Sequence, residues 1–126
     1  MIKTNLTIFV IDDDESVCRA LRDLLESAGF RVETFRSAKD FLDSGRSGSR
    51  GVLILDVRMP ELSGIELQKQ LAASGSKLPV IFITAHEDTL AEKTALEAGA
   101  VAFLQKPFDD QLLFDAIDIA LNRIVH

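Results

Sequence analysis

Five short strand-like runs alternate with five segments of helical periodicity, and this alternation limits the folds open to the chain. Four runs are almost entirely apolar and one alternates, which predicts strands at residues 6–11, 31–35, 52–55, 79–83 and 100–104. The spacing of apolar residues between them predicts helices at about 14–28, 38–42, 64–73, 88–98 and 109–123. Strict alternation favours parallel strands joined by right-handed crossovers, and therefore a three-layer α/β sandwich.

Length and charge exclude several classes of protein. The 126 residues fit one domain, and the Ser/Gly-rich stretch 44–51 is too short to separate two. A formal net charge of −6 argues against direct binding of nucleic acid or an anionic membrane surface by this domain. No run is long enough to span a bilayer, and residues 1–5 lack a signal-peptide stretch, so we expect a cytoplasmic protein. The single cysteine, Cys18, is expected to be a buried core thiol.

Polar side chains stand where four of the predicted strands end. Asp12 and Asp13 follow the first strand, while Asp56, Thr84 and Lys106 follow the third, fourth and fifth. The carboxyl ends of strands in an open parallel sheet share one edge, so these five side chains are expected to converge there. Each residue alone would be an ordinary capping or surface residue, but their common placement favours a functional site.

Such a set can hold a divalent cation and accept a phosphoryl group. Packed carboxylates repel one another unless a cation is present, and without a His or Cys cluster a hard ion such as Mg²⁺ suits the site. Lys106 and Thr84 would supply a positive charge and a hydroxyl to phosphoryl oxygens. Asp56 is the favoured nucleophile, forming an aspartyl-phosphate, because Asp12 and Asp13 are better placed as metal ligands.

Two neighbouring features have local structural interpretations. Asp13 or Asp14 can cap the helix that follows the first strand, and capping is the favoured role of Asp14. The bond between Lys106 and Pro107 is a candidate cis peptide, which would aim the lysine inward.

Four motifs carry a resemblance to a known family. They are VIDDDESV at 10–17, LDVRMPELSG at 55–64, FITAHED at 82–88 and AFLQKPF at 102–108. With these motifs, which follow one another in the family's order, the chain resembles the receiver domain of bacterial two-component response regulators. The resemblance implies a flavodoxin-like (βα)5 fold with a five-stranded parallel sheet of order 2-1-3-4-5. It also implies a phosphoacceptor served by a sensor histidine kinase, not an enzyme with its own substrate.

The resemblance implies a metal-binding role for four residues. Asp56 is then the phosphoacceptor, and it binds Mg²⁺ directly together with Asp13 and the backbone carbonyl of Arg58. Asp12 acts on the ion mainly through water. Mn²⁺ is the second candidate ion.

The resemblance also implies how the site is read out. Thr84 and Lys106 hold phosphoryl oxygens, and Phe103 is the aromatic switch residue that turns inward as Thr84 moves. The output surface would consist of the last two predicted helices and the strand between them. A homodimer of phosphorylated chains is expected to form through that surface, at 88–98, 100–104 and 109–123.

Two residues beside the site are less ordinary for the family. Arg58 and His86 each lie two positions past a site residue, and we hypothesise that they overhang the phosphoryl group and modulate attack by water. The alternative is two solvated side chains. Met59, Pro60 and Gly64 fit the family's loop after the acceptor.

The sequence of these motifs is similar to that of receivers that precede a LuxR-type helix-turn-helix domain. Residues 1–126 are therefore expected to be the N-terminal fragment of a longer transcription regulator, with a stand-alone receiver as the alternative.

Two other classes of protein compete with the receiver domain. A Mg²⁺-dependent phosphohydrolase would need a second acid where Arg58 stands, and room for a substrate cap. A flavin-binding module would need aromatic stacking and a phosphate-cradling loop, but the loop 12–15 is acidic and the chain has no Trp or Tyr.

Overall fold

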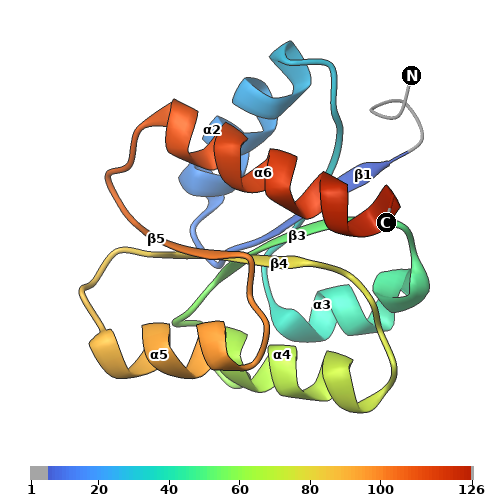
Figure 1. Cartoon of the computed structure of the whole chain (residues 1–126), viewed down its shortest axis with the longest axis vertical. Helices are drawn as coiled ribbons and strands as arrows, with labels where there is room; N and C mark the ends of the chain where they lie inside the picture. Colours follow the sequence, from blue (N-terminus) through green and yellow to red (C-terminus); the bar gives the residue numbers. More distant parts are fainter. Residues whose placement is uncertain (1–5, 126) are drawn as a thin grey trace.

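The computed structural model describes residues 6–125 and places a five-stranded parallel sheet between two layers of helices (Figure 1). Residues 1–5, in which the sequence shows no signal-peptide stretch, and residue 126 lie outside the described residues. The sheet order is β2-β1-β3-β4-β5, and the strands are β1 (Thr7–Ile11), β2 (Arg31–Phe35), β3 (Gly51–Asp56), β4 (Val80–Thr84) and β5 (Ala102–Gln105). All four pairings are parallel, which confirms the predicted flavodoxin-like topology.

Helices cover both faces of the sheet. Figure 1 shows one layer formed by α2 (Glu15–Ser27) and α6 (Asp110–Val125), and an opposite layer formed by α3 (Ala38–Asp43), α4 (Gly64–Ala73) and α5 (Thr89–Glu97). Within residues 6–125, no helix is both long and apolar enough to cross a bilayer.

The core is divided into two parts by the sheet. Because successive strand residues point to opposite faces, Ile8 and Val10 of β1 join the cluster under α2 and α6. Phe9 and Ile11 join the cluster under the other three helices. Cys18 is free and buried in the first cluster, as predicted. Burial on both faces explains why the central strands are almost entirely apolar.

Most element boundaries differ from the sequence prediction by one or two residues, and the structure adds one short element. The stretch expected to be a loop contains a short 3-10 helix, η1 (Arg46–Gly48). The fifth strand begins at Ala102, because the amide of Ala100 still donates to Ala95 O at the end of α5. Asp56 and Thr84 are the last residues of their strands, so the sheet itself positions them.

Candidate functional site

The carboxyl edge of the sheet carries a small cleft that gathers all five residues predicted from the strand ends. Asp12 follows β1, Asp56 and Thr84 end β3 and β4, and Lys106 follows β5. The cleft has a volume of about 200 Å³, and its lining residues are Asp12, Asp13, Asp14, Asp56, Arg58, Thr84, Ala85, His86 and Lys106. The register of four parallel pairings therefore brings together side chains from distant parts of the chain.

Three carboxylates in this cleft can converge on one ion. Oxygen atoms of Asp12, Asp13 and Asp56 all lie within 4.8 Å of one another. Asp12 and Asp56 are buried, while Asp13 is exposed to solvent. Hard oxygen donors grouped in this way, with no thiol or imidazole among them, fit a hard divalent cation.

Asp56 is the carboxylate whose ionisation is most affected by its surroundings. Burial, followed by repulsion from Asp12, raises the pKa of Asp56 to about 7, while Lys106 and the backbone N–H of Arg58 oppose the shift. The residue is only 7% exposed. A cation bound between these groups would favour the ionised carboxylate that can act as a nucleophile.

Asp12 is held on both sides of its carboxylate. The amide of Asp14 donates to Asp12 Oδ1 at 2.9 Å, and Lys106 Nζ donates to Asp12 Oδ2 at 3.1 Å. Asp14 itself caps α2, since its Oδ1 accepts from the amide and the hydroxyl of Ser16. The hydrogen bond from the Ser16 hydroxyl is the largest of the effects that lower the pKa of Asp14. The capping role predicted for Asp14 is confirmed, while the carboxylate of Asp13 lies near those of Asp12 and Asp56.

Residues 12–14 form an acidic turn after β1, and two residues for which the sequence indicated no role in the site anchor its backbone. Cys18 Sγ donates to Asp12 O at 3.3 Å, and Arg36 donates to Asp13 O from Nε at 3.2 Å and from Nη2 at 3.1 Å. The parallel register places Arg36 beside this turn, because Ile11 pairs with Phe35, but it does not indicate which oxygen the long side chain contacts. Burial raises the pKa of the Cys18 thiol, which fits a structural thiol.

The loop between β3 and α4 packs closely against the end of β3. A Cβ atom on Gly64 would lie 2.2 Å from the backbone oxygen of Asp56, so only glycine fits there. The Gly64 amide donates to Val57 O at 2.9 Å. Ser63 and Glu66 form a reciprocal capping box that fixes the start of α4.

The far side of the cleft is formed by the ends of β4 and β5. Thr84 Oγ1 accepts from the amide of His86 at 3.2 Å, and Thr84 O accepts from the amide of Lys106 at 2.7 Å. The bond between Lys106 and Pro107 is cis, as predicted. Phe103, on β5, is half-buried against Phe82 with ring centroids 6.0 Å apart, and it does not line the cleft.

The Arg58 side chain reaches toward the start of α5. Its Nη2 lies 3.5 Å from Asp88 Oδ2, so the guanidinium extends from the β3–α4 loop to the start of α5. Asp88 also caps α5, because its Oδ1 accepts from the amide of Ala91 at 3.0 Å. The sequence predicts Arg58 beside the site, but no pattern in it indicates this ion pair.

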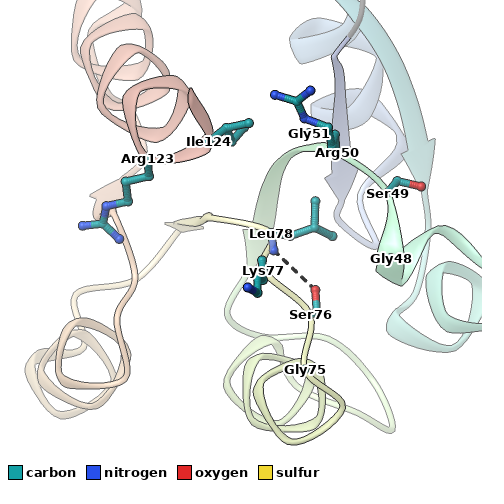
Figure 2. A pocket seen from close by; sticks show the side chains of 10 residues that line it. All are labelled: Gly48, Ser49, Arg50, Gly51, Gly75, Ser76, Lys77, Leu78, Arg123 and Ile124. Carbon is teal, nitrogen blue, oxygen red and sulfur yellow. Dashed lines mark hydrogen bonds between the residues drawn. The ribbon is translucent and has the colours of Figure 1, made fainter. Parts of the chain in front are cut away.

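A larger cavity lies away from the predicted site. It has a volume of about 670 Å³ and is formed by the end of η1, the start of β3, the loop before β4 and the end of α6 (Figure 2). Its basic side chains do not converge: in Figure 2 those of Arg50 and Arg123 point in different directions, and Arg123 Nη1 donates to Gly99 O. None of the residues predicted for the site lines it.

Fold and site together define an α/β domain able to hold a divalent cation beside a buried carboxylate. The family follows from the sequence: the model of the response regulator receiver domain matches residues 8–118, so the chain belongs to that family. Family membership decides against a phosphohydrolase and against a flavin-binding module. The resemblance noted from the motifs is thereby confirmed.

Individual relatives agree with this assignment. The chain is 48% identical over 119 residues to the transcriptional regulatory protein TdiR of Thauera aromatica, covering 93% of this chain and 52% of TdiR. The structure of the response regulator StyR is 51% identical, with a TM-score of 0.90 over 96% of this chain and 61% of StyR. FixJ-N is 38% identical, with a TM-score of 0.88 over 96% of this chain and 97% of FixJ-N. The chain thus spans about half the length of TdiR.

Proposed function

We propose that Asp56 accepts a phosphoryl group from the phosphohistidine of a sensor histidine kinase, with Mg²⁺ or Mn²⁺ as cofactor. The observation that carries the proposal is a buried carboxylate beside two further carboxylates and a lysine in one cleft. A bound cation supplies positive charge for the phosphoryl oxygens. Asp13 and Asp56 would be its direct ligands with the Arg58 carbonyl, and Asp12 would act mainly through water.

The reaction is a transfer between two nucleophiles. An oxygen of Asp56 forms a bond to phosphorus while the bond to the donor imidazole nitrogen breaks, and the electron pair of that bond leaves with the nitrogen. Lys106 and Thr84 stand where they can bind the phosphoryl oxygens, and stabilisation of the transferring group is mainly electrostatic. Arg58 and His86 line the same cleft, which supports a role in limiting later attack by water.

Phosphorylation would then change the output surface formed by α5, β5 and α6. The added charge and acceptor oxygens favour an arrangement with Thr84 drawn toward them and Phe103 turned inward behind it. Leu90 on α5 and Leu112 on α6 are 75% and 52% exposed, which supports a surface available for a homodimer. In sedimentation, the phosphorylated chain should dimerise, and a phosphorylated chain that remains monomeric would contradict this part.

The chain would serve as the receiver of a longer transcription regulator, with a LuxR-type effector domain after it. The span of about half of TdiR, a transcriptional regulatory protein, supports this proposal. Residues 1–126 would then be the receiver domain. The expected cytoplasmic location stays a prediction.

Intact mass spectrometry after incubation with acetyl phosphate tests the acceptor. Wild type should gain one phosphoryl group only when Mg²⁺ is present, and Asp56→Asn should gain none. Asp43→Asn is the matched control, because Asp43 is an exposed aspartate paired with Lys39, and it should behave as wild type. No gain in wild type, with Mg²⁺ binding confirmed by calorimetry, would overturn the proposal.

A further inference from the structure

Asp88 connects the site to helix α5 through its two carboxylate oxygens. One oxygen accepts from the amide of Ala91 and caps the helix, while the other lies 3.5 Å from Arg58 Nη2. Arg58 is two residues past Asp56 and is one of the residues that line the same cleft. The acceptor loop and the first turn of α5 are therefore joined by one ion pair.

This ion pair is weak enough to be exchanged. The side chains of Arg58 and Asp88 are 59% and 28% exposed, and a single contact of 3.5 Å between solvated groups contributes little. A phosphoryl group on Asp56 would bring close to two negative charges into the cleft that Arg58 lines. A guanidinium can bind either a carboxylate or a phosphate in a bidentate manner, and the larger negative charge of the phosphoryl group would favour it over one carboxylate.

We propose that phosphorylation transfers Arg58 from Asp88 to the phosphoryl group, so that this ion pair holds the start of α5 only in the unphosphorylated chain. Arg58 binds the phosphoryl group, and Asp88 is a positioning residue that acts through Arg58. The exchange rests on the proposed function of Asp56. It gives α5 a direct link to the acceptor, in addition to any movement of Thr84 and Phe103.

Affinity for beryllofluoride in the presence of Mg²⁺, measured by calorimetry, tests the exchange. Asp88→Asn keeps a capping side chain but removes the competing charge, so it should bind about threefold more tightly than wild type. Arg58→Gln should bind about fivefold more weakly. In the double variant, Asp88→Asn should add nothing to Arg58→Gln, because its effect requires Arg58.

Glu92→Gln removes a charge from the same first turn and controls for the general field of the helix, so it should match wild type. Hydrogen exchange at the Ala91 amide gives a second measurement: beryllofluoride should accelerate it in wild type but not in Arg58→Gln. Equal affinities of Asp88→Asn and wild type for beryllofluoride would overturn the exchange. So would an Asp88→Asn substitution that raises the affinity equally in wild type and in Arg58→Gln. If wild type binds no more beryllofluoride than Asp56→Asn, the proposed function itself fails.

Discussion

Lys106 Nζ lies 3.1 Å from Asp12 Oδ2, and this contact joins residues 94 positions apart in the chain. In the sheet, β3 and β4 lie between the strands that carry the two residues. Asp12 is 1% exposed and the Lys106 side chain is 23% exposed, so the pair is largely shielded from water. Lys106 thus compensates the most deeply buried charge of the cleft before any cation or phosphoryl group binds.

Replacing Lys106 by methionine should destabilise the metal-free protein. The change keeps most of the side-chain volume but leaves Asp12 and Asp56 without their cationic neighbour, and we expect a loss of about 2 kcal/mol in the free energy of unfolding. Saturating Mg²⁺ should recover most of this loss, because the ion supplies the missing positive charge. Urea denaturation with and without Mg²⁺ measures both values.

Lys39→Met is the matched control for this prediction. Lys39 forms a 2.7 Å ion pair with Asp43 that is exposed on both sides, so its removal should leave stability unchanged within error and independent of Mg²⁺. Equal losses in the two variants would show that shielding of the Lys106 pair has no energetic consequence.

The raised pKa of Asp56 predicts an unusual pH dependence of stability. Burial and Asp12 raise the pKa from 3.8 to about 7, so the folded protein binds more protons than the unfolded chain between these values. In the absence of divalent cations, the free energy of unfolding should therefore fall as pH rises from about 4 through about 7. Asp56→Asn removes this titration and should be more stable than wild type at pH 8, by about 2–4 kcal/mol.

Thermal melts in EDTA between pH 4 and pH 8 test this sign. The difference in melting temperature between Asp56→Asn and wild type should shrink toward pH 4, where the folded carboxyl is protonated and the unfolded carboxyl, with a pKa of 3.8, is becoming protonated as well. Asp43→Asn should follow the wild-type profile. A gap that widens on acidification would mean that Asp56 is stabilised as a carboxylate.

The strand ends could be predicted from the sequence because they follow from local pattern and topology alone. Apolar runs located Asp12, Asp56, Thr84 and Lys106, and parallel order placed them on one edge. The anchoring by Arg36 and the pairing of Arg58 with Asp88 could not be predicted in the same way. Long side chains with several rotatable bonds choose their partners from the tertiary neighbourhood, which no periodicity encodes.

Short elements escaped prediction for a related reason. The 3-10 helix η1 spans only three residues in a stretch rich in serine and glycine, so no apolar repeat marks it. β5 begins at Ala102 and not at residue 100, because the hydrogen bonds that end α5 extend past Gly99. The geometry of a helix end sets these bonds, and the apolar composition of the following strand does not reveal them.

Arg36 should support cation binding without touching the ion. Its two donors to Asp13 O hold the turn that presents the Asp13 carboxylate. Arg36→Gln shortens the side chain and should weaken Mg²⁺ affinity about tenfold, as expected when a group that orients a metal ligand is removed. Calorimetric titration with MgCl2 measures the change.

Arg22→Gln provides the comparison for Arg36. Arg22 and Arg36 line one surface groove beside α2, but Arg22 Nη2 donates to Thr34 Oγ1 and not to the acidic turn. Its loss should leave Mg²⁺ affinity unchanged. A tenfold effect in both variants would indicate that the positive charge of the groove, and not the anchoring of Asp13, governs affinity.

Gly64 should be the glycine least tolerant of substitution near the site. An added Cβ would lie 2.2 Å from Asp56 O, so Gly64→Ala must displace either the start of α4 or the acceptor residue. We expect a loss of about 3 kcal/mol in unfolding free energy and, on the proposed function of Asp56, slower phosphorylation by acetyl phosphate. Gly48→Ala is the matched control, because its Cβ would meet nothing within 4 Å, and it should leave both quantities unchanged. Normal phosphorylation in a destabilised Gly64→Ala would show that α4 shifts and that Asp56 keeps its position.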